Sequence, residues 1–221
     1  FMPQIVFSND EIIKGMRKKP MLAYPVSDKP INYKDNIFMQ PKLDGVRCVI
    51  QAEPWVTNEA SGYDIVAYSR TGKEWKNINH ILEQLQPFFD KYPNVILDGE
   101  LYNHDLRDDF EQIISMVRKT KPTDEARLIS AENVQFHCYD IIDEKLPFDR
   151  RIEFISESLM LMGDSIHGVL TMQVDSESYA KEIHDINKHN GYEGSILRTN
   201  DKYACKRSHN LRKFKDFHDA E

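Results

Sequence analysis

A lysine in a turn is the first residue of this sequence that could do chemistry. Lys42 lies in the segment PKLDGVR (41–47), where an Asp-Gly turn pair comes before an alternating run that predicts a strand. A lysine amine is a nucleophile once it is neutral and an electrophile is held beside it. Taken alone, the pattern Lys-x-Asp-Gly-x-Arg predicts only a surface turn, so a chemical role needs support from other residues.

Four further segments place charged or aromatic side chains at the edges of predicted strands. They are LDGEL (97–101), FHCYD (136–140), EGSILR (193–198) and LRKFK (211–215). Together with the first segment they resemble, in order and at plausible separations, the motifs of covalent nucleotidyltransferases. That group contains ATP-dependent DNA ligases, RNA ligases and mRNA capping enzymes. SRTG (69–72) resembles a further motif of the group, and PMLA (20–23) resembles the lead-in common in DNA ligases, so the resemblance covers residues 20–215.

The resemblance implies a three-step reaction at Lys42. The amine attacks ATP to give a lysyl-AMP, AMP passes to a 5′-phosphate at a nick, and a 3′-hydroxyl displaces AMP. A free lysine is neutral in only roughly one molecule in 2,500 at pH 7, so its pKa must fall. Lys213 and Lys215 are spaced to share one face of a strand, where their charges would lower that pKa and hold the α-phosphate.

Carboxylates and arginines supply the remaining charged groups. The resemblance implies Glu193 as a ligand of Mg²⁺ or Mn²⁺, Glu100 at the ribose hydroxyl and also at the metal, and Asp44 in the later steps at the nick. Divalent ions that accompany nucleotides prefer such oxygen ligands. Arg47 and Arg70 would bind the ribose region and the 5′-phosphate, because a planar guanidinium suits a phosphate.

Two residues are candidates for binding the base. Alternation in the run 134–142 places Phe136 and Cys138 on one face and His137, Tyr139 and Ile141 on the other. By resemblance Tyr139 stacks on the purine, although core packing explains the strand pattern equally well. Gln40 lies two residues before Lys42 and is placed to contact the purine edge, but its amide fits adenine or guanine. The ligase form of EGSILR favours ATP over GTP.

The elements that must position these residues are mixed in order. Helical spacing predicts helices over 78–89, 110–117, 152–162 and 179–186, with starts at Asp108, Asp149 and Ser176 for the last three and a stop near Gly191. Runs rich in β-branched and aromatic residues predict strands at 37–40, 46–52, 65–69, 95–97, 134–142, 169–174 and 195–198. Strands that often follow one another directly favour an α+β fold with mainly antiparallel sheets flanked by helices. The resemblance implies an ATP-grasp-like nucleotidyltransferase domain.

Composition limits the classes of protein that fit. A 40% hydrophobic and 29% charged chain with no membrane-length apolar run and no signal core predicts a globular protein inside the cell, in cytoplasm or nucleoid, or a viral or phage enzyme in its host. Three scattered cysteines indicate neither disulfides nor a zinc site. The net charge of −7 argues against a protein that mainly neutralises nucleic-acid phosphates, but residues 202–215 form a basic strip and 14–19 a smaller basic cluster.

The resemblance also bears on domains and partners. It implies that residues 1–221 form a single adenylation domain, and that the oligonucleotide-binding (OB) β-barrel of the family is absent, since the six residues after Lys215 cannot form it. We therefore expect an isolated domain or a minimal enzyme aided by a helper protein, acting as a monomer on nicked duplex DNA. The alternatives are an RNA ligase, a GTP-dependent capping enzyme and a non-catalytic nucleotide or nucleic-acid binding module.

Overall fold

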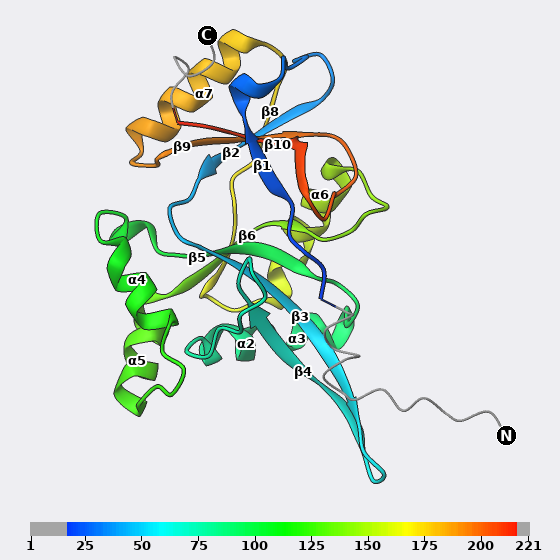
Figure 1. Cartoon of the computed structure of the whole chain (residues 1–221), viewed down its shortest axis with the longest axis vertical. Helices are drawn as coiled ribbons and strands as arrows, with labels where there is room; N and C mark the ends of the chain where they lie inside the picture. Colours follow the sequence, from blue (N-terminus) through cyan, green and yellow to red (C-terminus); the bar gives the residue numbers. More distant parts are fainter. Residues whose placement is uncertain (1–16, 216–221) are drawn as a thin grey trace, which may run out of the picture.

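Two five-stranded sheets organise the molecule. A computed structural model describes residues 17–215, and in Figure 1 one sheet lies above the other. The first sheet has the order β1 (Leu22–Pro25), β10 (Arg207–Phe214), β9 (Gly194–Thr199), β2 (Ile37–Lys42), β8 (Met172–Val174). The second has the order β4 (Ser61–Tyr68), β3 (Val46–Val56), β5 (Leu97–Tyr102), β6 (Gln135–Ile141), β7 (Ile166–Gly168). Only the β1–β10 and β6–β7 pairs are parallel among the described strands, so the predicted α+β fold with mainly antiparallel sheets is confirmed.

Helices cover the outer faces of both sheets. The helix α7 (Glu177–His189) packs on the first sheet, and Ala180 and Ile183 bury their side chains against Ile37 and Leu197. The larger core lies under the second sheet, where α2 (Asn79–Gln84), α3 (Gln86–Lys91) and α6 (Phe148–Ser158) contribute residues. The pair α4 (Phe110–Val117) and α5 (Asp124–Asn133) lies beside α2. None of the helices within residues 17–215 has the length and apolar character to span a membrane.

The predicted helix ends were partly wrong. Ser176 caps α7 through the Tyr179 amide as predicted, and Gly191, with φ of +91°, follows its end. The cap of α4 is Asp109 rather than Asp108, and α6 begins before Asp149, after Pro147. The predicted helix over 78–89 is two short helices. Helix α5, with its cap Thr123, was not predicted because its low amphipathicity gave no periodic signal.

A β-bulge in β6 places Tyr139. Adjacent residues Asp98 and Gly99 of β5 pair with Asp140 and Cys138, so Tyr139 is the extra residue of β6. The bulge reverses the alternation of the strand after this point. Ile141 therefore joins Phe136 and Cys138 in the core, and the prediction that Ile141 shares the face of Tyr139 is wrong.

Candidate active site

A cleft of about 450 Å³ opens between the two sheets. Most of its lining residues come from β1, β2, β3, β5, β6, β9 and β10, and the lining extends in sequence from Leu22 to Lys213. Its walls include these seven residues predicted from the sequence: Gln40, Lys42, Arg47, Arg70, Glu100, Tyr139 and Lys213. Asp44, Glu193 and Lys215 are not among the lining residues, although Glu193 contacts Lys42 directly. The sequence motifs thus converge on one site.

Lys42 ends β2 and is paired with a carboxylate. Its Nζ lies 2.6 Å from Oε2 of Glu193, and Oε1 of the same carboxylate lies 2.6 Å from Nζ of Lys215. Burial pushes the pKa of Glu193 up, but hydrogen bonds from Lys215 and Lys42 outweigh it and leave the pKa below its usual value. Glu193 is therefore an anion at neutral pH. The sequence predicted that Lys215 acts on Lys42 directly, whereas in the structure Glu193 lies between the two amines.

Gly194 allows this arrangement. In β9 it pairs with Lys42, and a Cβ added to it would overlap the carbonyl oxygen of Phe214 at the end of β10. The absence of a side chain lets the end of β10 approach closely, which brings Lys215 to Glu193. Lys213 lies in β10, two residues before Lys215, and lines the cleft.

Glu100 is a buried acid with hydrogen-bond partners. Burial raises its pKa from 4.5 to about 7, although Arg47 and the hydroxyl of Tyr139 act in the opposite direction. Its Oε1 accepts a hydrogen bond from the Tyr139 hydroxyl at 3.0 Å, and its Oε2 accepts one from the Gly45 amide at 3.3 Å. Glu100 therefore titrates in the physiological range and touches both the lysine loop and the aromatic residue.

Arg47 is not a free arginine. Its Nε and Nη2 donate to the two oxygens of Asp98 at 2.7 Å each, and Nη2 also donates to the carbonyl of Met21. Asp98 is fully buried and accepts a further hydrogen bond from Tyr203. The guanidinium lies 5.4 Å from the centre of the Tyr139 ring. Arg70, by contrast, is exposed at the rim of the cleft.

Both ends of the Gln40 side-chain amide form hydrogen bonds within the protein. Its Nε2 donates to the carbonyl of Tyr139 at 3.1 Å and to Oγ1 of Thr171 at 3.0 Å, and its Oε1 accepts from Nε of Arg198 at 2.7 Å. The first of these bonds satisfies the carbonyl of the bulge residue. An arginine only donates and a carbonyl only accepts, so the orientation of the amide is fixed.

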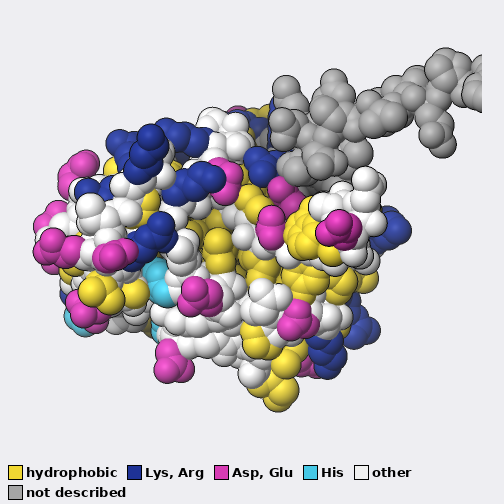
Figure 2. Space-filling view, turned by 90° about the horizontal axis from the view of Figure 1, so that it is seen from below, with side chains coloured by type: hydrophobic (Ala, Val, Ile, Leu, Met, Phe, Trp, Pro, Cys, Tyr) yellow, Lys and Arg dark blue, Asp and Glu magenta, His cyan; other side chains and the backbone are white. Residues whose placement is uncertain are grey.

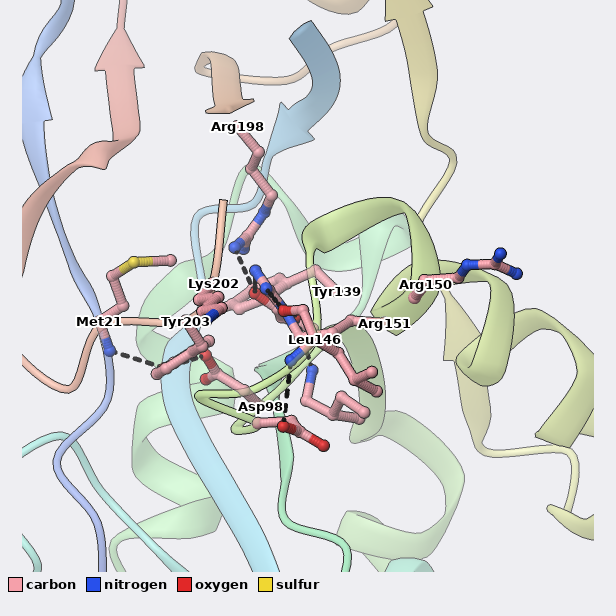
Figure 3. A network of polar contacts seen from close by, with 12 residues as sticks. Met21, Asp98, Tyr139, Leu146, Arg150, Arg151, Arg198, Lys202 and Tyr203 are labelled. Carbon is pink, nitrogen blue, oxygen red and sulfur yellow. Dashed lines mark hydrogen bonds and ion pairs between the residues drawn. The ribbon is translucent and has the colours of Figure 1, made fainter. Parts of the chain in front are cut away.

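Asp140 joins the two sheets. Its carboxylate accepts Nε of Arg151 at 2.7 Å from α6 and Nη1 of Arg198 at 2.8 Å from β9, and all three side chains are buried. Figure 3 shows Arg151 and Arg198 pointing into this network and the neighbouring Arg150 pointing away from it. No role was predicted from the sequence for Asp98, Asp140, Arg151, Arg198 or Tyr203. The available signal was an acid inside an apolar run, in VILDG (95–99) and CYDII (138–142), since a buried acid requires a buried cation.

The basic strip 202–215 is not one continuous surface. Arg212 is buried and donates to the carbonyls of His209 and Lys29, and Arg207 donates to the carbonyl of Ala23. In the cluster 14–19, Arg17 pairs with Glu53 and Lys18 with Glu144, while Lys14 lies outside the described residues. On the face seen in Figure 2, basic side chains gather in separate patches with acidic side chains between them.

The described side chains do not form a complete metal site by themselves. Residues 17–215 contain no group of three or more His, Cys, Asp or Glu that could hold a metal ion by themselves. Glu193 is an ionised carboxylate beside the lysines, and its side chain is 27% exposed. It can therefore contribute one ligand to an ion that also takes phosphate oxygens and water. The three cysteines are free, and Cys48 and Cys138 are buried.

Comparisons with solved structures show the same fold. A Lig E DNA ligase is 21% identical, with a TM-score of 0.67 over 90% of this chain and 69% of that one. The Chlorella virus DNA ligase-adenylate is 18% identical, with a TM-score of 0.64 over 89% and 68% of the two chains. Pmar-Lig_Pre is 21% identical, with a TM-score of 0.70 over 90% and 46%. The chain thus spans between 46% and 69% of the length of these structures.

Sequence comparison identifies the family. No curated protein sequence matches the chain. A family model described as ATP dependent DNA ligase domain matches residues 20–215, which is the region over which the motifs occur and the two sheets form. The chain therefore belongs to the ATP-dependent DNA ligase domain family and is its adenylation, or nucleotidyltransferase, domain.

Proposed function

We propose that this domain joins AMP from ATP to Lys42 and passes it to the 5′-phosphate of a nick in duplex DNA. The observation that supports this most directly is the position of Lys42. Its amine lies in a cleft between the sheets, and Lys213 and Lys215 approach it from the end of β10. Two amines on one carboxylate, with Lys213 lining the same cleft, form a site for phosphate groups once the carboxylate is engaged elsewhere.

The chemistry follows from these groups. The Nζ of Lys42 forms a bond to the α-phosphorus of ATP, the bond to pyrophosphate breaks, and the proton of the amine passes to solvent water. Lys213 and Lys215 stabilise the charge that develops on the phosphoryl oxygens. In the second step a 5′-phosphate oxygen attacks the same phosphorus and Lys42 leaves. A 3′-hydroxyl then attacks the 5′-phosphate and releases AMP, with Asp44, Arg47 and Arg70 proposed to act at the nick and the ribose.

Glu193 is better suited to holding cations than to accepting a proton. Its lowered pKa makes it a weak base, and it already holds two ammonium groups. A divalent ion, Mg²⁺ or Mn²⁺, would be held by Glu193 with the triphosphate and water, and would neutralise phosphate charge. Glu100 has both carboxylate oxygens engaged by Tyr139 and Gly45 and fits a ribose hydroxyl better than a metal.

Tyr139 and Gln40 would form the base site. The ring of Tyr139 and the side chain of Ile196 line the cleft from opposite sheets, so a purine can enter between them. Gln40 lines the same cleft and contributes through its fixed amide.

The first experiment incubates the full chain with Mg²⁺ and α-labelled ATP or GTP and measures label that survives denaturation. Wild type is expected to label with ATP, Lys42→Ala to lose the label, and the exposed control Lys34→Ala to keep it. Labelling from GTP alone would contradict the ligase function, and labelling of Lys42→Ala would exclude this nucleophile.

A second experiment separates nucleotide transfer from sealing. It supplies a nick that already carries 5′-AMP and measures joining without ATP, with DNA or RNA on the 3′ side. Joining of the DNA substrate supports the proposal, and a requirement for RNA would make the domain an RNA ligase. Adding an oligonucleotide-binding domain or a helper protein is expected to raise the rate, because a second contact surface increases the time that the nick is held.

A further inference from the structure

A second groove runs out from the active site cleft. It has a volume of about 1080 Å³, and Leu22 and Arg70 line both the groove and the cleft. Its walls are formed by residues 17–20 before β1, residues 70–74 in the turn after β4, and residues 205 and 206 before β10, together with side chains of β3 and β4. The two spaces therefore meet at Leu22 and Arg70.

The backbone of this groove is fixed. The amide of Leu22 donates to the carbonyl of Lys206 at 3.2 Å, which holds the first wall beside the third. The hydroxyl of Tyr68 lies 3.4 Å from the carbonyl of Lys18. The turn at Arg70 is closed by hydrogen bonds from Ser69 to Lys73 and from Gly72 to Ser69, and Gly72 has the positive φ that the turn requires.

The charge in the groove is unbalanced. Lys19, Arg70 and Lys206 are exposed and form no ion pair with other residues in 17–215. Of the three acids in the groove, Glu53 pairs with Arg17 and Glu74 with Lys76, which leaves Asp64. Exposed cations without carboxylate partners on a body of net charge −7 favour a local polyanion.

We propose that this groove carries the sugar-phosphate backbone of the DNA strand that bears the 5′-phosphate, and that Lys19 and Lys206 each contact a phosphate. This rests on the proposed function, because that function brings the 5′-phosphate to Lys42. The DNA strand that continues from that phosphate must leave the cleft, and Arg70 lies where the cleft meets the groove. The contacts are with phosphates and therefore do not depend on sequence.

The test uses the salt dependence of binding. The affinity of the full chain for a nicked duplex is measured by fluorescence anisotropy at several KCl concentrations. For Lys19→Ala/Lys206→Ala, the slope of log K against log salt should fall by about 2, and affinity near 0.1 M salt should fall roughly tenfold or more. Lys29→Ala/Lys34→Ala is the matched control, since both lysines are exposed and lie outside the groove and the cleft.

Replacing charged phosphates of the DNA with uncharged analogues identifies which strand lies in the groove. Methylphosphonates placed on the 5′-phosphate side of the nick should weaken wild type but have little further effect on Lys19→Ala/Lys206→Ala. The same groups on the 3′-hydroxyl side should weaken both proteins equally. An unchanged salt slope, a loss equal to that of the control, or sensitivity on the 3′-hydroxyl side alone would overturn the proposal.

Covalent labelling with ATP distinguishes failure of this proposal from failure of the proposed function. Labelling needs no DNA, so the double variant should label as wild type does. If wild type fails to label while the double variant shows the expected change in slope, the groove proposal is supported and the proposed ligase function is contradicted. Labelling with an unchanged slope gives the opposite result. Lys19→Arg/Lys206→Arg should restore binding.

Discussion

Glu193 holds Lys42 and Lys215 at the same distance of 2.6 Å through different carboxylate oxygens. The proposed nucleophile is thus paired with the residue proposed to help hold the metal, and the second lysine is kept beside it. An incoming triphosphate offers the lysines new anionic partners. Glu193 then becomes free to bind a cation, so one carboxylate can serve the site before and after nucleotide arrives.

Glu193→Gln is predicted to separate activity from stability. The amide cannot balance two ammonium groups or bind a divalent ion well, and loss of one charge at the reacting centre typically costs about 10²- to 10³-fold in rate. The free energy of unfolding should change by no more than about 1 kcal/mol, because the ion pairs are partly exposed. Single-turnover labelling and urea unfolding measure the two effects. Glu157→Gln, on the exposed face of α6, should change neither quantity.

Glu100 is predicted to give the stability a pH dependence. Its pKa is about 7 in the folded protein against an ordinary value of 4.5, so the folded state binds this proton more tightly than the unfolded state. The stabilisation is complete below about pH 4.5 and is lost as the pH rises through 7, with a slope approaching 1.4 kcal/mol per pH unit. Urea titrations should show this slope between about pH 5 and 7 in wild type relative to Glu100→Gln, and the slope should level off above pH 7. Equal slopes in the two proteins would contradict the assignment.

Tyr139→Phe is predicted to raise the pKa of Glu100 further. The Tyr139 hydroxyl donates to the ionised carboxylate and lowers its pKa, so its removal favours the protonated form. The ring remains available for stacking. The pH profile of covalent labelling should therefore shift to higher pH with little loss of ATP affinity. A shift to lower pH would show that the hydrogen bond acts in the opposite sense.

Arg151 and Arg150 provide a matched pair for the buried network. Arg151→Ala removes one partner of the buried Asp140 and should destabilise the protein by about 3–5 kcal/mol. Arg150→Ala breaks an exposed pair with Glu153 and should change the stability by less than about 1 kcal/mol. Denaturant unfolding measures both. Similar values for the two variants would mean that the Asp140 network adds little to the fold.

Thr171 is predicted to affect the choice of base through Gln40. Both amide hydrogens of Gln40 are donated to Tyr139 and Thr171, so the amide can offer the cleft only an acceptor, which suits the amino group of adenine. Thr171→Val frees one hydrogen for the carbonyl oxygen of guanine. The ratio of GTP to ATP labelling should rise about fivefold, because one ordinary hydrogen bond contributes about 1 kcal/mol of free energy. Thr171→Ser keeps the hydroxyl and should keep the wild-type ratio.

The sequence predicted which residues meet better than it predicted how they are paired. The five motifs place Lys42, Glu100, Tyr139 and Lys213 at strand edges, and the antiparallel sheets bring these edges to one cleft. Periodicity cannot show that Glu193 lies between two lysines, because that contact joins residues 151 positions apart and depends on the missing side chain of Gly194.

The bulge at Tyr139 and the network at Asp140 were missed for a related reason. A strand with one extra residue has the same composition as a regular one, and only the pairing with β5 shows the change of face at Ile141. Asp98 and Asp140 are acids inside apolar runs, and their arginine partners come from β3, β9 and α6. Local patterns contain no information about such distant partners.

The bond from Asp140 to Arg198 has a mechanical consequence. This buried ion pair joins β6 of one sheet to β9 of the other. Gln40 accepts a hydrogen bond from Arg198 and donates one to the carbonyl of Tyr139, so both residues are held to the pair. Opening the sheets would leave charges uncompensated in the interior, so the width of the cleft is set before a nucleotide arrives. The base should enter a rigid receptor, and its binding should follow a single exponential without a slow closing phase.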